Sequence, residues 1–316
     1  MTRYRNALPQ LGDQLFLADG GLETTLIFHQ GVELPDFASF HLLRTSDGEN
    51  VLRQYFRTYA ALARRYGTGL IADTATWRAS TDWTVRRGLS AADTRDIHRR
   101  SVSLLEELRE EFAPVPTVIN GVIGPRGDGY VPSSLMTVRH AEAYHQLQVD
   151  MLAEAGADML SAMTLNYVEE AIGIVQAARH AAMPIAISFT VETDGRLPTG
   201  QSLGAAIELV DGATSHYPLY YMVNCAHPTH FAHLLDPAEA WVSRVRGIRA
   251  NASCMSHAEL NDSPELDIGD PVELAASYAE LRQRLPQITI LGGCCGTDHR
   301  HVERIAAACT AMLAAV

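Results

Sequence analysis

The sequence predicts an α/β protein, specifically a (β/α)8 TIM barrel, and three observations lead to that fold. Short apolar segments rich in β-branched residues recur at intervals of roughly 30 to 50 residues, and eight of them can be counted. Amphipathic stretches of helical periodicity separate them. The first segment is followed by Asp-Gly-Gly-Leu-Glu-Thr at 19–24, which lacks the Gly-x-Gly-x-x-Gly fingerprint of dinucleotide-binding sheets. Because such barrels commonly exceed 250 residues as one domain, we expect residues 1–316 to form a single domain.

The expected elements alternate along the chain, as a parallel barrel requires. Strands are expected at 14–19, 69–76, 117–124, 158–164, 184–191, 219–225, 246–251 and 287–292. Apolar residues at i, i+3 and i+4 predict helices over 49–66, 91–112, 139–155, 168–179, 203–210, 271–285 and 298–313. The segment 230–240 has the weakest helical pattern, although a helix is expected there by position.

Composition excludes several functional classes. The 316 residues are 47% hydrophobic, which supplies a large core and excludes a disordered chain. Lys and Arg number 25 against 37 Asp and Glu, and this net charge of −12 disfavours a nucleic-acid surface. The sequence has neither an apolar run of about 18 residues nor the apolar segment of a signal peptide. We therefore expect a cytoplasmic protein without nucleic-acid or membrane partners, and the sequence leaves open whether it forms a homo-oligomer.

Three of the five cysteines are expected at one edge of the barrel. Cys225 ends the sixth predicted strand, and Cys294 and Cys295 end the eighth. Barrel enzymes place their sites at the C-terminal ends of the strands, so these thiols can converge there. Three thiolates suit Zn²⁺ and leave a fourth position open, as in catalytic zinc sites. An odd number of cysteines without a secretion signal also argues against a disulfide framework.

Other interpretations of the cysteines remain open. Two adjacent cysteines are often just small buried apolar residues, but the glycines around this pair and a third cysteine at another strand end favour metal binding. Cys309 lies on an apolar helix face and is expected in the core. Cys254 follows the seventh strand, and as a fourth ligand it would close the metal into a structural site, the less favoured alternative.

Several segments resemble the homocysteine S-methyltransferases, zinc-dependent (β/α)8 barrels that act on homocysteine with betaine or S-methylmethionine. The strongest likeness is the pair Val223-Asn224-Cys225 and Gly-Gly-Cys-Cys-Gly at 292–296. Weaker matches are Asp19-Gly20-Gly21, Thr74-Ala75-Thr76, Gly-Val-Ile-Gly-Pro at 121–125, and Asn251, so the likeness spans nearly the whole chain. The resemblance implies that Cys225, Cys294 and Cys295 bind zinc and that Asp19 belongs to the pocket of the substrate thiol.

The resemblance and the strand ends together give a set of candidate substrate-binding residues. The set comprises Asp19, Gly20, Thr74, Thr76, Trp77, Arg78, Met163, Asn224 and Asn251. At the end of strand four the family usually has a Glu that binds the amino group of homocysteine, and Met163 stands there in this chain. A thioether cannot replace a carboxylate that faces an ammonium. Either a neighbouring acid substitutes, with Glu23, Asp73 and Glu192 as candidates, or the acceptor is not homocysteine.

The expected reaction is a methyl transfer from an onium donor of the S-methylmethionine, S-adenosylmethionine or betaine type to a zinc-bound thiol. Zinc lowers the pKa of a thiol, which is otherwise mostly protonated at pH 7. An onium donor leaves as a neutral molecule, so no catalytic residue beyond the zinc-bound substrate thiolate is expected. Aromatic faces attract onium groups, and Trp77, Tyr130, Tyr167 and Tyr220 lie near predicted strand ends. Arg78 and Arg126 could each hold a carboxylate.

The favoured function is a homocysteine S-methyltransferase-like enzyme of class EC 2.1.1 that makes methionine and serves methionine biosynthesis. A different thiol or selenol acceptor is the nearest alternative. A zinc hydrolase is disfavoured because three thiolates make zinc a poor Lewis acid. A non-catalytic zinc-binding barrel also remains open. The chain shows no appended cobalamin or folate module, so a corrinoid-borne methyl group would need another chain.

Overall fold

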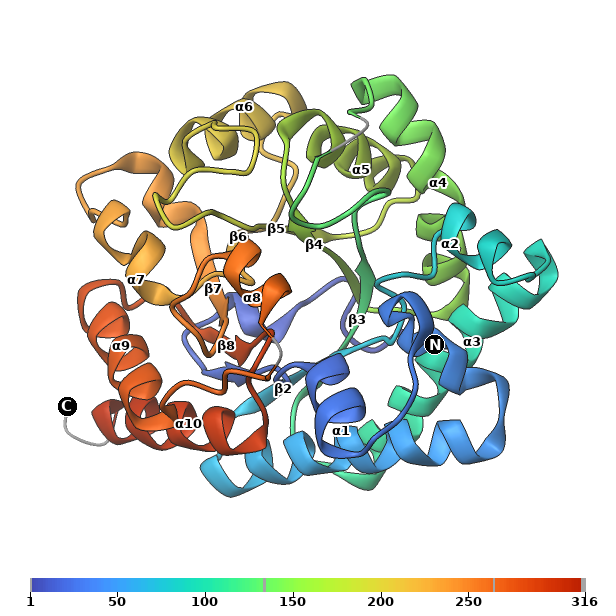
Figure 1. Cartoon of the computed structure of the whole chain (residues 1–316), viewed down its shortest axis with the longest axis horizontal. Helices are drawn as coiled ribbons and strands as arrows, with labels where there is room; N and C mark the ends of the chain where they lie inside the picture. The colour runs from blue at the N-terminus through green and yellow to red at the C-terminus, as the bar shows by residue number, and fades with distance from the viewer. Residues whose placement is uncertain (1, 133–134, 264, 314–316) are drawn as a thin grey trace.

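The computed structural model describes residues 2–132, 135–263 and 265–313, and its eight parallel strands close into a barrel (Figure 1). The strands pair in chain order, and β1 closes the ring through Phe16 opposite Ile290 of β8. The predicted (β/α)8 architecture is therefore confirmed. The strands are β1 Phe16–Leu17, β2 Gly69–Asp73, β3 Thr117–Ile123, β4 Met159–Leu165, β5 Ile185–Phe189, β6 Tyr221–Asn224, β7 Val245–Ala250 and β8 Ile290–Gly293.

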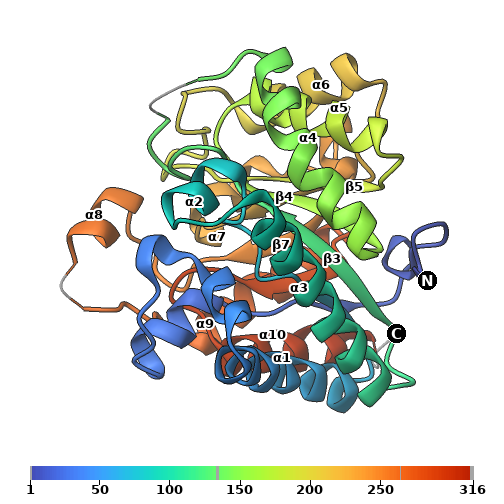
Figure 2. The ribbon, with the colours of Figure 1, turned by 90° about the vertical axis from the view of Figure 1, so that its right-hand side faces the viewer.

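A ring of helices surrounds the strands (Figures 1 and 2). Seven of them lie close to the ranges expected from periodicity: α1 Ser46–Tyr66, α3 Ala91–Glu111, α4 Val138–Ala155, α5 Val168–His180, α6 Leu203–Thr214, α9 Pro271–Arg284 and α10 His299–Leu313. The expected helix at 230–240 is wrong in length, because α7 spans only Pro228–Phe231 before a 3-10 turn at Ala232–Leu234. Pro237 explains the early end, since proline lacks an N–H and disfavours helical geometry at the preceding residue.

Capping residues fix the ends of the long helices. The Thr45 side chain accepts a hydrogen bond from the Gly48 N–H at the start of α1, which ends at Gly67 in the left-handed conformation (φ 65°). Thr137 caps α4 in the same way, and that helix also ends at a left-handed glycine, Gly156 (φ 99°). These turns return the chain directly to the next strand.

Short elements that periodicity could not predict stand over the C-terminal ends of the strands, which we call the barrel mouth. They are α2 Thr81–Arg86, α8 His257–Asp262, and π and 3-10 turns at Thr24–His29, Pro35–Phe37 and Ser39–Arg44. In Figure 2, α2 and α8 project to the left, whereas the N-terminus lies on the right at the opposite end of the barrel.

The barrel interior is packed. Phe16, Ile71, Val118, Met159 and Met222 project into it and form an inner apolar cluster. Tyr4 and Leu8 from the N-terminal segment also pack against this cluster. Burying each large apolar side chain contributes about 1.5–3 kcal/mol, so the filled interior is a main source of stability. The packed interior separates the polar strand ends at the mouth from the N-terminal end of the barrel.

No helix in the described residues is long and apolar enough to span a membrane.

Candidate metal and substrate site

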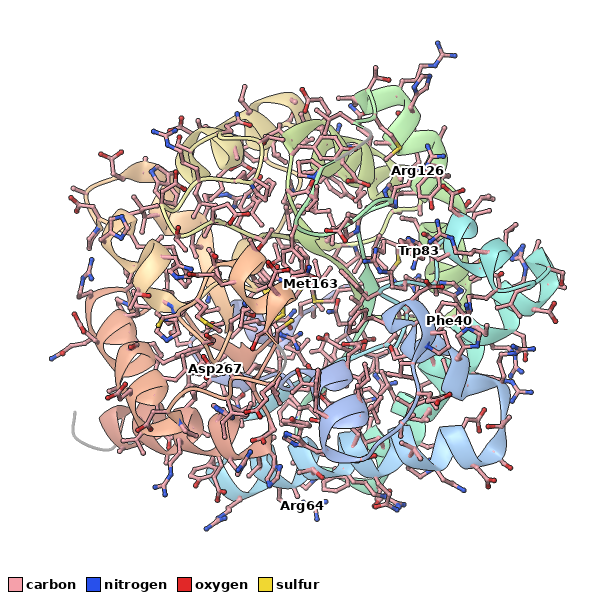
Figure 3. The ribbon with its side chains drawn as sticks, viewed as in Figure 1. Phe40, Arg64, Trp83, Arg126, Met163 and Asp267 are labelled. Atoms are coloured by element: carbon pink, nitrogen blue, oxygen red, sulfur yellow. A yellow bond between two sulfur atoms is a disulfide. The ribbon has the colours of Figure 1, made fainter. Side chains whose placement is uncertain are left out.

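Three cysteine sulfurs meet at the barrel mouth. Cys225 directly follows β6, Cys294 and Cys295 directly follow β8, and their Sγ atoms all lie within 4.8 Å of one another. In the described part of the chain no other group of three or more His, Cys, Asp or Glu side chains is this close. The structure therefore brings together the three residues that the sequence nominated as metal ligands. Figure 3 labels Met163 near the barrel axis, at the same mouth.

Two of these sulfurs are joined in the structure. Cys225 and Cys294 form a disulfide, and Cys295 remains a free thiol. The cysteine count argued against a disulfide framework, and the disulfide seen in the described residues instead joins two of the three candidate metal ligands. β6 and β8 flank β7 on its two sides, so the residues that follow them lie close together and their sulfurs come into contact. Because a metal would need both sulfurs as thiolates, the disulfide and a metal-bound state exclude each other.

The backbone at the site adopts unusual conformations. Cys225 (φ 55°) and Thr164 (φ 62°) are both non-glycine residues in the left-handed region. Each such residue costs about 1–3 kcal/mol and persists only where the surrounding structure holds it. The register of β4 shifts between Ala162 and Leu165, and the Thr164 Oγ1 comes within 3.8 Å of the Cys225 Sγ. Thr164 therefore belongs to the site, although no sequence pattern marked it.

Glycines permit the adjacent cysteines and the strand-one turn. Gly296 lies in the left-handed region (φ 77°), which lets the chain turn back immediately after Cys295. A Cβ atom on Gly20 would lie 2.8 Å from the Tyr59 hydroxyl, so Gly20 is required by close packing. The role of Gly20 seen here is backbone packing beside the pocket.

Polar groups point at the sulfurs. The Asn224 Nδ2 donates to the Cys225 Sγ at 3.2 Å and lies 4.0 Å from the Cys294 Sγ. The Tyr130 hydroxyl lies 3.6 Å from the Cys295 Sγ. The Asn224 Oδ1 accepts from the Thr164 N–H at 2.9 Å, which fixes the amide orientation. Hydrogen-bond donors near a sulfur stabilise a thiolate, while burial acts in the opposite direction and raises the pKa of Cys295.

Asn251 lies directly behind Cys225. Its Nδ2 donates to the Cys225 carbonyl at 3.0 Å, which helps hold the left-handed residue. Its Oδ1 is buried and has no hydrogen-bond partner among the described residues. Buried acceptors are rarely left unpaired, so Asn251 can still accept a hydrogen bond from a ligand at this site.

A buried charge cluster lies below the sulfurs. The Arg249 guanidinium forms ion pairs with both Asp19 and Asp73. The other Asp19 oxygen accepts from the Tyr55 hydroxyl at 3.0 Å, and Asn120 donates to Asp73 at 2.7 Å. Burial raises the pKa of Asp19, and the facing Arg249 opposes that rise. Both carboxylates therefore already have partners within the protein.

Arg249 was missed in the sequence analysis. Its signal was a charged residue inside the otherwise apolar run Ile248–Ala250 of a strand expected to be buried. Burial opposes and the two carboxylates favour the charged guanidinium, and the net effect raises the pKa of Arg249.

The candidate residues of strand two divide into two groups. The Thr74 and Thr76 hydroxyls lie 2.6 Å apart, and both are bonded to the Val122 backbone of β3, so they brace two strands. Trp77 is half-buried, and its Nε1 donates to the Met163 carbonyl at 3.3 Å. The Arg78 guanidinium stacks over Trp77 at 4.2 Å. Trp77, Arg78 and Met163 therefore lie together on one side of the mouth.

Glu192, the third candidate substitute for the strand-four Glu, already has a partner. Its Oε1 lies 3.3 Å from the His257 Nδ1, and the His257 Nε2 lies 2.6 Å from the Cys225 carbonyl. The Tyr130 ring packs against the His257 ring at 4.2 Å between centroids. Helix α8, which begins at His257, thus covers Cys225, and sequence periodicity gave no signal for it because the helix is only six residues long.

Two of the four aromatic candidates lie away from the sulfurs. Tyr220 precedes β6, so it lies at the opposite end of the barrel, where it belongs to the inner apolar cluster. The Tyr167 hydroxyl accepts from the Met136 N–H at 3.1 Å and is occupied in packing a loop. Trp77 and Tyr130 remain the aromatic faces at the site.

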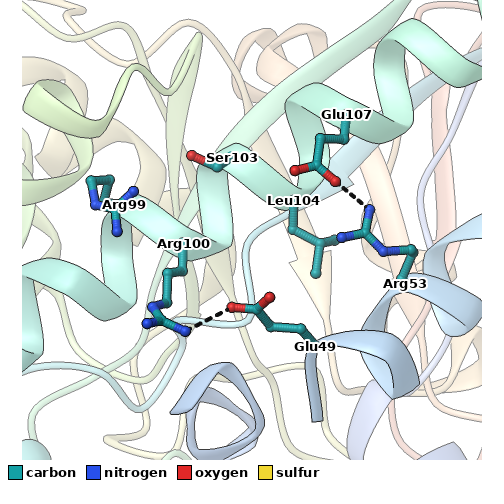
Figure 4. Close-up of a pocket in the computed structure, with 7 residues that line it drawn as sticks. All are labelled: Glu49, Arg53, Arg99, Arg100, Ser103, Leu104 and Glu107. Carbon is teal, nitrogen blue, oxygen red and sulfur yellow. Dashed lines mark hydrogen bonds and ion pairs between the residues drawn. The ribbon is translucent and has the colours of Figure 1, made fainter. Parts of the chain in front are cut away.

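A groove on the outer wall has a different character. It lies between α1 and α3, and ion pairs Arg53–Glu107 and Arg100–Glu49 bridge it (Figure 4). These exposed pairs contribute at most about 1 kcal/mol each and leave their charges satisfied. The groove offers no chemistry comparable to that of the barrel mouth.

Comparisons with known proteins agree with this geometry. Residues 16–309 match the family model described as Homocysteine S-methyltransferase. Homocysteine S-methyltransferase YbgG of Bacillus subtilis is 26% identical over 255 residues, which cover 75% of this chain and 78% of that protein. Methionine synthase of Mycobacterium leprae is 28% identical over 236 residues, which cover 68% of this chain but 18% of that protein.

Solved structures show the same fold. The oxidized form of the homocysteine methyltransferase MmuM from Escherichia coli superposes with a TM-score of 0.77 at 22% identity, covering 96% of this chain and 99% of that chain. The family model spans most of the chain, and the cysteine triad stands at the strand ends where the resemblance places it. The chain belongs to the homocysteine S-methyltransferase family and is a homocysteine S-methyltransferase-like enzyme.

Proposed function

We propose that this protein is a zinc-dependent S-methyltransferase that transfers a methyl group from an onium donor to a thiol, with homocysteine as acceptor and methionine as product. The observation that carries the proposal is the group of three sulfurs within 4.8 Å at the mouth of a barrel that matches the family. Cys225, Cys294 and Cys295 are the proposed ligands, because three sulfur donors suit Zn²⁺ and leave one position for a substrate. When bound, zinc lowers the pKa of the substrate thiol and so supplies a thiolate nucleophile.

The side chains around the sulfurs orient the reactants. Asn224 and Tyr130 donate toward the cysteine sulfurs and hold them in place. Met163 and Trp77 form an apolar wall that excludes water from the thiolate. Trp77 and Tyr130 also offer aromatic faces to an onium methyl group. Because the donor leaves as a neutral molecule, positioning for in-line attack is the main contribution of the protein.

The other nominated residues form the walls of the substrate pocket in this proposal. Gly20, Thr74 and Thr76 hold the strand ends, while Asp19 and Asn251 supply polar surface below and beside Cys225. We further propose that residues 1–316 act as one barrel domain.

The active state requires reduction of the Cys225–Cys294 disulfide, because both sulfurs are needed as thiolates. The E. coli relative has been solved in an oxidized form and in a metallated form, which supports two exchangeable states of such a site.

A direct test is mass spectrometry of methylated products. Reduced, zinc-loaded protein is incubated with homocysteine and, in turn, with S-methylmethionine, S-adenosylmethionine and betaine. Methionine formation with at least one donor, abolished by a zinc chelator while the barrel stays folded by circular dichroism, is the expected result. Unfolding on chelation, or no product with any donor and a wider panel of thiols, would instead indicate a structural zinc barrel.

A further inference from the structure

Arg78 is a buried cation without a carboxylate partner. It is 7% exposed, and its guanidinium lies between the Trp77 and Trp83 rings, 4.2 and 4.1 Å from their centroids. One Nη donates to the Gly127 carbonyl at 2.7 Å, but the Nε is buried and unpartnered. Within the described residues no acid approaches it to 4.0 Å. A guanidinium held between two rings with a free donor is ready to bind a carboxylate.

Glu23 is an acid without a cation partner. It follows Gly21 in the turn after β1, is half-buried, and forms no ion pair within 4.0 Å in the described part of the chain. The turn is fastened to the loop after the cysteine pair, because the Gly21 N–H donates to the Thr297 carbonyl at 3.0 Å and the Gly296 N–H to the Thr24 Oγ1 at 3.0 Å. Glu23 therefore lies against the loop that carries Cys294 and Cys295.

Glu23 and Arg78 both belong to the barrel mouth. A Cβ atom on Gly21 would lie 2.6 Å from the Cys294 carbonyl oxygen, so the turn that carries Glu23 packs directly on the cysteine pair. Burial raises the pKa of Glu23 itself, and Arg78 is among the groups that oppose this. On the other side of the mouth, Trp77, which stacks on Arg78, donates from its Nε1 to the Met163 carbonyl, and the adjacent Thr164 Oγ1 lies 3.8 Å from the Cys225 Sγ. An anion and a cation thus face one mouth without being paired to each other.

We propose that Arg78 binds the carboxylate, and Glu23 the ammonium, of an α-amino acid acceptor whose thiol reaches the cysteine triad. The inference rests on the proposed function and assigns its acceptor site. A zwitterion carries its two charges on neighbouring groups, so it gives each protein charge a partner. The other acids near the mouth already have partners in the protein. Arg249 pairs with Asp19 and Asp73, His257 faces Glu192, and the Asp128 Oδ1 accepts from the Tyr130 and Val131 N–H groups. Glu23 therefore takes the role of the family's strand-four Glu, whose position Met163 occupies in this chain.

Thiol binding to reduced, cobalt-substituted protein tests this without a methyl donor, through the thiolate-to-cobalt absorption band. Three probes are titrated: homocysteine, homocysteine lacking its amino group, and homocysteine lacking its carboxylate. We expect Glu23→Gln to weaken binding of the two probes that carry an amino group by about 10- to 100-fold. The affinity for the probe without an amino group should stay unchanged. We expect Arg78→Gln to weaken binding of the two probes that carry a carboxylate by a similar factor. The affinity for the probe without a carboxylate should stay unchanged.

Matched controls lie on neighbouring segments. Glu33→Gln removes an exposed acid from the segment that carries Glu23, and Arg86→Gln removes an exposed arginine that also stacks on Trp83. Both controls should bind all three thiols as the wild type does. Glu23→Asp and Arg78→Lys should restore part of the lost discrimination, which a merely structural effect would not do.

The outcomes separate the two proposals. If none of the thiols alters the cobalt band of the wild type, the proposed function fails. If thiols bind but Glu23→Gln and Arg78→Gln weaken all three equally or not at all, the acceptor assignment is overturned and the function stands. Met163→Glu gives an independent check: with Glu23 already in place it should not improve homocysteine relative to the amine-free thiol, and an improvement would contradict the role of Glu23.

Discussion

The two ends of the barrel both bury charged residues, but they treat them differently. At the N-terminal end Asp158 is fully buried and accepts hydrogen bonds from the Arg109 side chain at 2.9 Å and the Ile119 N–H at 3.0 Å. The N–H groups of Arg3 and Tyr4 complete its partners. At the mouth, Arg249 is likewise paired with Asp19 and Asp73, but Arg78 and Glu23 are left without ion partners in the described residues. Cys225 and Thr164 also hold left-handed conformations there.

This difference separates stability from function. A saturated carboxylate fastens the N-terminal segment and α3 to β4, and it has no capacity left for a ligand. Unpaired charges cost stability, so they are retained where a ligand completes them. The mouth therefore should tolerate mutation without unfolding, whereas the closed end should not.

The largest effect is expected at the cysteine triad. Changing Cys225 or Cys294 to Ala leaves two thiolates, and we expect zinc affinity to fall by at least about 100-fold, with loss of methyl transfer. Metal content after dialysis against a competing chelator measures this. The thermal midpoint should change little, since the packed interior lies below the site. A variant that unfolds together with metal loss would remove the distinction between the two ends.

Asp158→Ala makes the opposite test at the closed end. It leaves the Arg109 guanidinium and the Ile119 N–H buried without their acceptor and releases the Arg3 and Tyr4 N–H groups, so we expect a loss of about 3–5 kcal/mol in the free energy of unfolding. Urea denaturation measures the loss. Zinc content and the KM for the acceptor thiol should match the wild type. A change in KM as large as that of a mouth variant would show that the two ends are coupled.

The helical wall between the two ends contains a buried histidine that makes the free energy of unfolding depend on pH by about 2 kcal/mol. His98 on α3 is fully buried, its Nδ1 lies 2.8 Å from the Thr94 carbonyl, and burial lowers its pKa to about 4. Its ordinary pKa is about 6.5, so the unfolded chain binds a proton first as the pH falls. Stability is therefore complete above pH 6.5 and declines from there toward pH 4.

His98→Asn isolates that effect, because an amide can still donate to the Thr94 carbonyl. Between pH 7 and pH 5 the wild type should lose about 2 kcal/mol more than this variant in urea denaturation. Equal losses in the two proteins would mean that His98 is protonated in the folded state. Metal binding at constant pH should not distinguish them.

The sequence predicted the strands and long helices of the barrel better than the contacts at its mouth. Periodicity and strand spacing predicted all eight strands and the long helices, because these depend on repeated apolar contacts. The glycine-flanked cysteine pair and Cys225 were found because strand ends converge in a parallel barrel. Arg249, Thr164 and His257 were not found, since an ion pair across the barrel, a left-handed residue and a six-residue helix leave no periodic trace. The pairing of Glu192 and Asp73 likewise depends on contacts between distant segments.

The smallest effects are expected at the two cysteines outside the triad. They decide whether the metal keeps an open coordination position for the substrate thiol. Cys309 is fully buried on α10, so Cys309→Ala should cost about 1 kcal/mol in the free energy of unfolding and leave zinc in place. Cys254 is exposed after β7 and lies outside the group of mutually close sulfurs, so Cys254→Ser should change neither stability nor zinc content. Metal analysis of the two variants beside Cys225→Ala is the measurement. Zinc loss in Cys254→Ser would mean that a fourth thiolate closes the metal, and a closed site has no position for the acceptor thiol.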